Sequence, residues 1–272
     1  MRKHLTSSIM TASALAAALL LAYAPAQSQA PADGKAPPDA KAGFKGGKGG
    51  GRGPAVTGPT PKMADGKVDF SGLYNSAGPV GDIAARNILA PGEEIVMTEA
   101  AEKIYKSRQS KDDPEANCLP TGVPRASPYP WRIVQTPTHM FFLFEGNIHS
   151  YRQIFIDGRK HDPDPDPTWY GDSVGTWNGD SIVIDTIGYN DKFWFDFAGH
   201  PHTTQLRTVE TMTRPDLGTV NIEVQIIDPG AYKKPFKLKY AARLMARGEL
   251  TEYICQENQQ DAQHLVGGAG LN

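Results

Sequence analysis

The chain has 272 residues, with 28 Lys+Arg against 30 Asp+Glu and two cysteines. A formal net charge of −2 gives no global reason to expect nucleic acid as a partner, and two cysteines exclude a disulfide-dense scaffold and a four-cysteine zinc site. The 28 Gly and 22 Pro also argue against an all-helical bundle, because both residues break helix interiors.

The first 26 residues have the pattern of a secretory signal peptide. Arg2 and Lys3 supply the positive start, an apolar run spans 9–23, and an Ala-Pro-Ala triplet at 24–26 offers a cleavage site. The apolar run is shorter than the ~20 residues of a membrane span, so a membrane anchor is the weaker alternative. We therefore expect a periplasmic or secreted protein with no transmembrane segment after cleavage.

Residues 27–67 are expected to form a disordered tether. They hold ten Gly, six Pro and a net charge of +4, with Phe44 as their only aromatic residue. Such a stretch cannot bury enough apolar surface to offset the entropy of ordering it. A basic arm that contacts anionic polymers is the alternative interpretation. The remaining residues, 68–272, contain 19 basic and 27 acidic side chains, a formal charge of −8, and are long enough for one acidic domain.

One helix is predicted, over 98–107. Thr98 is the expected N-cap, because its hydroxyl can accept a hydrogen bond from the first helical turn. The expected apolar stripe consists of Ala101, Ile104 and Tyr105.

The remainder is predicted to be mostly β. A proline-rich stretch over 119–130 is expected to wrap the domain as extended chain. Short β-type runs follow at 131–136, 139–145, 148–156, 173–178, 181–187, 203–213, 219–227, 236–245 and 250–256. Turn residues separate these runs, as in the Asn-Gly pair at 178–179. About nine antiparallel strands predict an all-β, closed meander barrel, or failing that a sandwich, and a barrel of this size can hold one small ligand.

The two cysteines leave two possibilities open. Cys118 lies before the predicted barrel and Cys255 lies in its last predicted strand. In an exported protein they can form a disulfide, or they can be two buried free thiols.

Polar and aromatic residues gather between 149 and 210, while the usual nucleotide, serine-hydrolase, zincin and haem motifs are missing from the sequence. No cofactor is predicted. The expected catalytic residues are His200, His202, Asp196, Glu210, Arg152 and Tyr151. The expected substrate-binding residues are Trp169, Trp194, His149, Arg159 and Tyr253.

The roles follow from the chemistry of each side chain. In an extended segment His200 and His202 share a face, so either can abstract a proton while Asp196 or Glu210 orients it. The same two histidines with Glu210 or His149 are the ingredients of a metal site, and ordinary polar loop histidines are the third possibility.

The remaining candidates are expected to hold the substrate. Arg152 and Tyr151 would stabilise a developing oxyanion, and Arg152 or Arg159 can clamp a carboxylate or phenolate. If Arg152 faces the barrel interior it must be paired, because an unpaired buried charge is very costly. Trp169 and Trp194 can stack on a ring, and Tyr253 is placed to reach the same cavity.

Several motifs together resemble a family of exported bacterial proteins, and the resemblance covers most of 66–265. The motifs are Asp-Asp-Pro at 112–114, Cys-Leu-Pro at 118–120, Pro-Arg at 124–125, Arg-Gln-Ile at 152–154, Asp-Gly-Arg at 157–159, Trp-Tyr-Gly-Asp-Ser-Val-Gly-Thr-Trp-Asn-Gly-Asp at 169–180, Asp-Thr at 185–186 and Gly-His-Pro-His at 199–202. The tryptophan hairpin is also similar to lipocalin-type (calycin) barrels, which implies the fold and no single activity.

The leading functional hypothesis is a cofactor-free lyase or isomerase that uses His/Asp acid–base chemistry on a small hydroxylated aromatic or sugar-derived substrate. The alternatives are a periplasmic carrier of a small apolar or aromatic ligand, and a metal-dependent enzyme that uses His200 and His202.

Overall fold

The computed structural model describes residues 55–75, 78–125, 129–146, 150–258 and 268. Strands of one sheet dominate these residues: β1 (Gly72–Tyr74), β2 (Trp131–Gln135), β3 (His139–Phe144), β4 (Tyr151–Phe155), β5 (Asp172–Asn178), β6 (Ser181–Ile187), β7 (Arg207–Asp216), β8 (Thr219–Ile227) and β9 (Phe236–Arg243). The nine strands follow chain order in the sheet. The all-β prediction is therefore confirmed.

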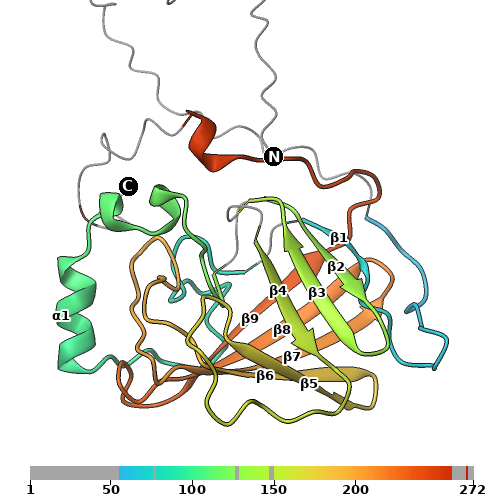
Figure 1. Ribbon diagram of the computed structural model, residues 1–272, viewed down its shortest axis with the longest axis horizontal. Helices are drawn as coiled ribbons and strands as arrows, with labels where there is room; N and C mark the ends of the chain where they lie inside the picture. Colours follow the sequence, from blue (N-terminus) through green and yellow to red (C-terminus); the bar gives the residue numbers. More distant parts are fainter. Residues whose placement is uncertain (1–54, 76–77, 126–128, 147–149, 259–267, 269–272) are drawn as a thin grey trace, which may run out of the picture. The chain divides into compact units, whose positions relative to one another are not determined.

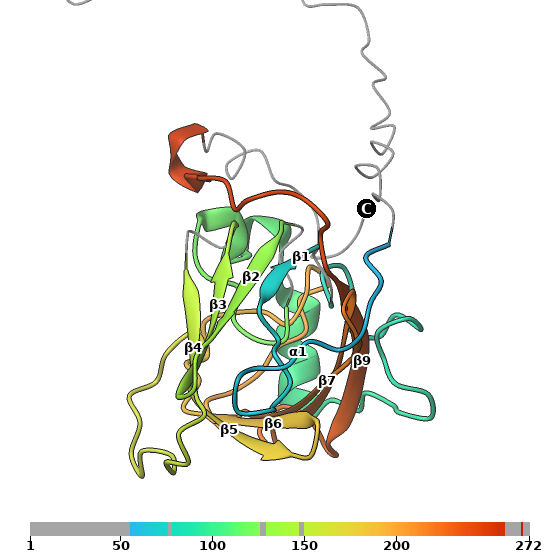
Figure 2. The same ribbon diagram turned by 90° about the vertical axis from the view of Figure 1, so that its right-hand side faces the viewer.

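The sheet curls into a nearly closed, lipocalin-like barrel. Figure 2 shows β2–β4 and β7–β9 as facing walls, with β5 and β6 between them along the bottom. The two ends of the sheet meet where β1 approaches the chain after β9. There the Asn75 amide donates to the Arg243 carbonyl at 2.9 Å, and the Met245 amide donates to the Leu73 carbonyl at 2.8 Å. These bonds cover the sheet edges that an open sandwich would leave unpaired.

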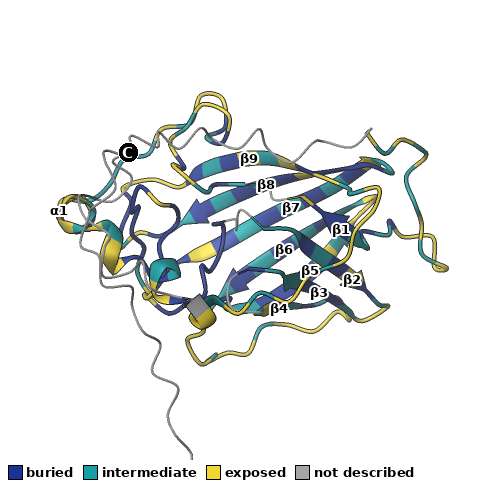
Figure 3. Ribbon diagram, turned by 90° about the horizontal axis from the view of Figure 1, so that it is seen from above, coloured by how far each residue is buried: buried dark blue, intermediate teal, exposed yellow. Residues whose placement is uncertain are grey.

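Alternation along the strands fills the barrel. Side chains of a strand point to opposite faces in turn, so one set is buried and the other meets water. In β8 the buried set is Val220, Ile222, Val224 and Ile226, while Asn221 between them is exposed. Figure 3 shows the same alternation of buried and less buried positions along β7–β9.

The predicted strands match eight of the observed ones, and the ninth is different. The strand expected at 250–256 is wrong: residues 250–254 have no regular structure, and a 3-10 helix, η4 (Cys255–Asn258), follows. β1 takes the ninth place in the sheet. With three residues β1 is too short to show alternation, so its pattern could not be recognised in the sequence.

One pairing also departs from the expected antiparallel meander. β4 and β5 meet in a single parallel pair, Phe155 with Val174. The chain from 156 to 171 makes no hairpin, and its Asp-Pro repeats at 162–167 are mostly exposed and belong to no strand. A parallel pair requires the chain to return along β4 before β5 begins, and this loop makes that return. Its prolines lack an amide donor, which disfavours pairing of the loop with a strand.

The helix forms where it was predicted. α1 (Glu99–Ser107) begins after Thr98, whose hydroxyl accepts from the Ala101 amide at 3.2 Å. Ala101 is buried and Tyr105 packs on His200, but Ile104 is 46% exposed, so its place in the apolar stripe was predicted wrongly. Two 3-10 helices follow, η1 (Ser110–Asp112) and η2 (Glu115–Asn117), on the same side of the barrel as α1 (Figure 1).

After η2 the chain runs over the barrel as a segment that we name the strap, residues 118–125. Cys118 forms a disulfide with Cys255, which decides between the two expectations for the cysteines. Gly122 has φ +68°, and a Cβ at this position would lie 2.4 Å from the Phe193 ring. Glycine is therefore the residue that lets the strap approach Phe193, in the loop between β6 and β7, this closely.

The packed chain begins earlier than the predicted boundary at 68. The Leu217 amide donates to the Gly58 carbonyl at 3.0 Å, and the Thr60 hydroxyl donates to the Arg214 carbonyl at 3.0 Å. Residues 55–67 thus contact the β7–β8 turn, and the two segments supply hydrogen-bond partners for each other's backbone groups. The predicted signal peptide and the rest of the predicted tether lie outside the described residues.

Candidate functional site

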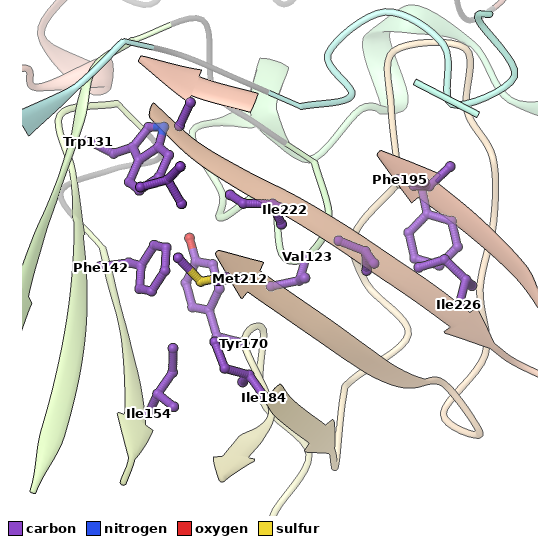
Figure 4. Close-up of a cluster of buried hydrophobic side chains, with 14 of the residues drawn as sticks. Val123, Trp131, Phe142, Ile154, Tyr170, Ile184, Phe195, Met212, Ile222 and Ile226 are labelled. Carbon is purple, nitrogen blue, oxygen red and sulfur yellow. The ribbon is translucent and has the colours of Figure 1, made fainter. Parts of the chain in front are cut away.

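A small pocket lies inside the barrel, beneath the strap. Its walls are aromatic and aliphatic side chains, with three charged groups and one phenol among them: Gly122, Val123, Pro124, Arg125, Trp131, Phe142, Phe144, Arg152, Glu210, Ile222 and Tyr240. Figure 4 shows Trp131 and Phe142 from one wall pointing toward Ile222 and Val123 from the other. The free volume of about 50 Å³ suits a small ligand or a few waters, since one water needs roughly 10–15 Å³.

The barrel strands place a charged pair in this apolar pocket. Arg152 comes from β4 and Glu210 from β7, and both point inward because they occupy buried positions in the alternation. They are 3% and 4% exposed, and Nη2 of Arg152 donates to Oε2 of Glu210. The expectation that a buried Arg152 must be paired is confirmed.

Two hydroxyls complete the surroundings of the guanidinium. Nη2 of Arg152 also donates to Oγ1 of Thr186 at 2.9 Å, and Nε donates to Oγ of Ser173 at 3.3 Å. The two hydroxyls are 3.0 Å apart and bond one another. The charge of Glu210 keeps the pKa of Arg152 above its usual value despite the opposing effect of burial. Arg152 therefore stays charged and is held by three protein partners.

Two phenols lie near the same charged pair: Tyr189 is fully buried and Tyr240 is half-buried. Burial raises the pKa of Tyr189 to about 12, and the nearby Glu210 charge acts in the same direction. Tyr240 on β9 lines the pocket, and burial together with Glu210 raises its pKa as well. Both hydroxyls consequently keep their protons at neutral pH, and the hydroxyl of Tyr240 is available to a ligand.

The strap covers one side of the pocket and is held by its own charges. Arg125 is 4% exposed and makes two hydrogen bonds to Asp113, each 2.8 Å, and a third to Glu115 at 2.7 Å. Burial raises the pKa of Glu115, although the Arg125 charge opposes this shift. The strap is thereby tied to η2 and, through Cys118, to the C-terminal segment.

His200 and Asp196 lie together, as predicted, but in the loop before β7 and not in the pocket. Nδ1 of His200 lies 2.7 Å from Oδ2 of Asp196. The same carboxylate accepts from the amides of Ile83 at 2.6 Å, Gly199 at 2.9 Å and His200 at 3.0 Å. A buried carboxylate with four donors fixes the shape of its loop, so its observed contacts are structural.

His202 occupies a different environment from His200. Its ring lies 3.8 Å from the Phe193 ring and 5.2 Å from the Phe195 ring, and Nδ1 is 3.2 Å from the Thr203 carbonyl. Burial lowers its pKa to about 4. The expectation that the two histidines share one face is wrong, because the segment is not a regular strand.

Acid should therefore destabilise the fold through His202. An unfolded histidine titrates near 6.5 and the folded one near 4, so between these pH values only the unfolded chain binds this proton. As the pH falls from 6.5 to 4, we expect a loss of up to about 3 kcal/mol, which the neutral variant His202→Phe should not show. Urea unfolding at several pH values measures this loss. The matched variant His139→Phe should keep the acid sensitivity, and an equal sensitivity in His202→Phe would contradict the assignment.

The structure does not assemble the predicted metal site. Among the described residues, Asp82, Asp196 and His200 are grouped closely enough to hold an ion, and His202 and Glu210 are not part of that group. Nδ1 of His200 faces the Asp196 carboxylate at hydrogen-bond distance.

Three of the predicted substrate-binding residues, Trp169, Trp194 and Arg159, do not line the pocket. Trp194 is buried under the Arg108 guanidinium at 4.6 Å, and Trp169 packs on the outside of the core. Arg159 is held by Asp157 and stacks on a ring of β4. His149 lies outside the described residues.

Two tyrosines are also displaced from their expected places. Tyr151 is 59% exposed. It precedes Arg152, which points into the barrel, so Tyr151 points outward and does not face the same ligand atom as Arg152. The ring of Tyr253 packs against that of Tyr129, with the centroids 4.8 Å apart, and Tyr253 lies outside the sheet.

Sequence reasoning missed most of the pocket. Trp131, Phe142 and Ile222 were seen only as strand residues, and Tyr240 only as a position in an alternating run. The strand pattern could have identified Tyr240. It shares a face with Leu238, and the residues that alternate with them are lysines, so this face is expected to point into the barrel. Arg125, in contrast, carried no periodic signal at all.

Comparison with protein-family models, with curated proteins and with solved structures finds no match to this chain. Across the described residues, the helices are all too short or too polar to cross a membrane.

Proposed function

We propose that this protein is a binding protein for a small aromatic ligand, which it holds in the barrel pocket. The supporting observation is the pocket itself: stacked Trp131 and Phe142, 5.3 Å apart, lie beside a buried charged pair and a protonated phenol. An apolar pocket with a few convergent polar groups is the arrangement that small-molecule sites use. The disulfide also supports the proposal of an exported, periplasmic or secreted protein.

Acid–base chemistry by the histidines is the weaker proposal. Neither His200 nor His202 lines the pocket, and Asp196 is occupied by the backbone of its own loop. A lyase or isomerase acting in this pocket would instead use Glu210 and Tyr240, of which Glu210 is held by Arg152.

Fluorescence titration tests the binding proposal. Phenol added to the full chain should change the emission of Trp131 with a Kd below about 1 mM, as expected for a ligand of one ring. The variant Trp131→Phe should lose this signal, and Trp177→Phe, which alters a tryptophan outside the pocket, should retain it. Absence of a saturable, Trp131-dependent change would contradict the proposal. NMR of the recovered ligand separates carrier from enzyme, because a carrier returns it unchanged.

A further inference from the structure

Resting on the proposed binding function, we infer that the pocket selects neutral hydroxylated rings over carboxylates, and that Glu210 is the residue that sets this preference. The argument follows from the charges in the pocket, from the donors that remain on its arginines, and from the groups left for a ligand.

Each positive charge of the pocket already has a counterion without a ligand. Arg152 is paired with Glu210, and Arg125 is paired with Asp113 and Glu115. An anionic ligand would therefore leave water for a pocket with no excess positive charge. Since desolvation of an unpaired carboxylate is costly, an anion is disfavoured there.

The arginines also lack an edge that could clamp a carboxylate. A bidentate clamp needs two parallel N–H groups on one edge of the guanidinium. Nε of Arg152 donates to Ser173, and both hydrogens of Nη2 are used by Thr186 and Glu210. Every two-nitrogen edge of the Arg152 guanidinium includes one of these nitrogens, so no free edge remains. The earlier idea that Arg152 clamps a carboxylate or phenolate is therefore not supported by its geometry.

What remains suits a hydroxyl group. The bonds to Ser173, Thr186 and Glu210 use Nε and Nη2 of Arg152 and Oε2 of Glu210, so Nη1 of Arg152 and Oε1 of Glu210 are the donor and the acceptor that these bonds leave for a ligand. A hydroxyl both donates and accepts, so one such group can satisfy both atoms. The hydroxyl of Tyr240 offers a third contact on the same pocket.

The surrounding walls favour a ring as the body of the ligand. Trp131 and Phe142 are nearly parallel, with an interplanar angle of 17°, and Phe144 completes the aromatic side of the pocket. Flat apolar ligands gain both burial and stacking against such walls. The free volume of about 50 Å³ is smaller than the roughly 150 Å³ of a cavity that binds benzene, so even a single ring enters only when the strap or the lining side chains move.

The test compares four one-ring ligands with the wild-type chain at pH 7, followed by Trp131 emission. Phenol and benzyl alcohol should bind at least about tenfold more tightly than benzoate, and about three- to tenfold more tightly than toluene, which lacks the hydroxyl. Benzoate binding as tightly as phenol would overturn the inference. If all four ligands bind with equal affinity, the proposed binding function is supported and the inferred selectivity is refuted. If none changes Trp131 emission, the proposed function fails and the inference with it.

Two variants locate the selectivity. Glu210→Gln leaves the charge of Arg152 unmatched, so benzoate should gain about tenfold and phenol should lose a similar factor. Tyr240→Phe keeps the fold and the charges, and it should weaken phenol about threefold while leaving toluene unchanged. Unaltered preference in both variants would overturn the assignment to these residues. Because Tyr240→Phe removes only a hydroxyl, it remains informative if Glu210→Gln fails to fold.

Discussion

Replacing Arg152 or Glu210 alone should destabilise the fold by about 3–5 kcal/mol, while replacing both by methionine should restore most of that loss. Each single variant leaves a buried charge without its counterion at a position 3–4% exposed. The double variant Arg152→Met/Glu210→Met leaves no charge behind. Methionine has a similar volume and adapts to irregular space, so the packing of the barrel is preserved.

The hydroxyls around the pair make this recovery possible. When Arg152 is removed, Ser173 and Thr186 still bond one another at 3.0 Å, so neither is orphaned. Thr208 bonds the hydroxyl of Tyr189 at 2.7 Å and does not depend on the pair. The cost of the single variants should therefore come from the remaining charge and not from lost hydroxyl partners.

Urea unfolding at pH 7 of the wild type, both single variants and the double variant measures the effect. A matched control exists on the surface, where Arg207 pairs with Asp185 but is half exposed. Arg207→Met should cost less than about 1 kcal/mol. A double variant as unstable as the sum of the singles would contradict the expectation, because additive effects would mean that the two residues are not energetically coupled.

The strands could be predicted because burial on one face imposes a period of two. The runs at 181–187, 219–227 and 236–245 show this period and become β6, β8 and β9. The run at 250–256 contains the same residue types, but Cys255 is bonded to Cys118 and the sheet edge after β9 is already occupied by β1. Local composition cannot reveal that a neighbouring place in a sheet is taken.

Only those features of the site that follow from the energetics of a single residue could be predicted. That Arg152 must be paired if buried follows from the cost of a buried charge, and it holds. Its partner lies 58 residues away on another strand, and only the sheet register brings the two together. The histidines were placed by assuming an extended segment, whereas four donors to Asp196 fold that segment into a tight loop.

Loss of the Cys118–Cys255 disulfide should lower the free energy of unfolding by about 5 kcal/mol. The bond joins positions 137 residues apart, and a cross-link that closes so long a loop removes much of the entropy of the unfolded chain. The variant Cys118→Ser/Cys255→Ser should therefore unfold at a much lower urea concentration than the oxidised wild type. Added reductant should lower the midpoint of the wild type and leave that of the variant unchanged. An unchanged wild-type midpoint after confirmed reduction would contradict the expectation.

Ligand affinity should respond far less than stability to the same change. The strap carries a second attachment, since Arg125 is bonded to Asp113 and Glu115 independently of the disulfide. The disulfide mainly constrains the unfolded chain, whereas the Arg125 bonds shape the folded pocket wall. Below the unfolding transition, phenol should therefore bind the serine double variant within about threefold of the wild type. A tenfold weaker affinity in the folded variant would show instead that the disulfide itself holds the strap over the pocket.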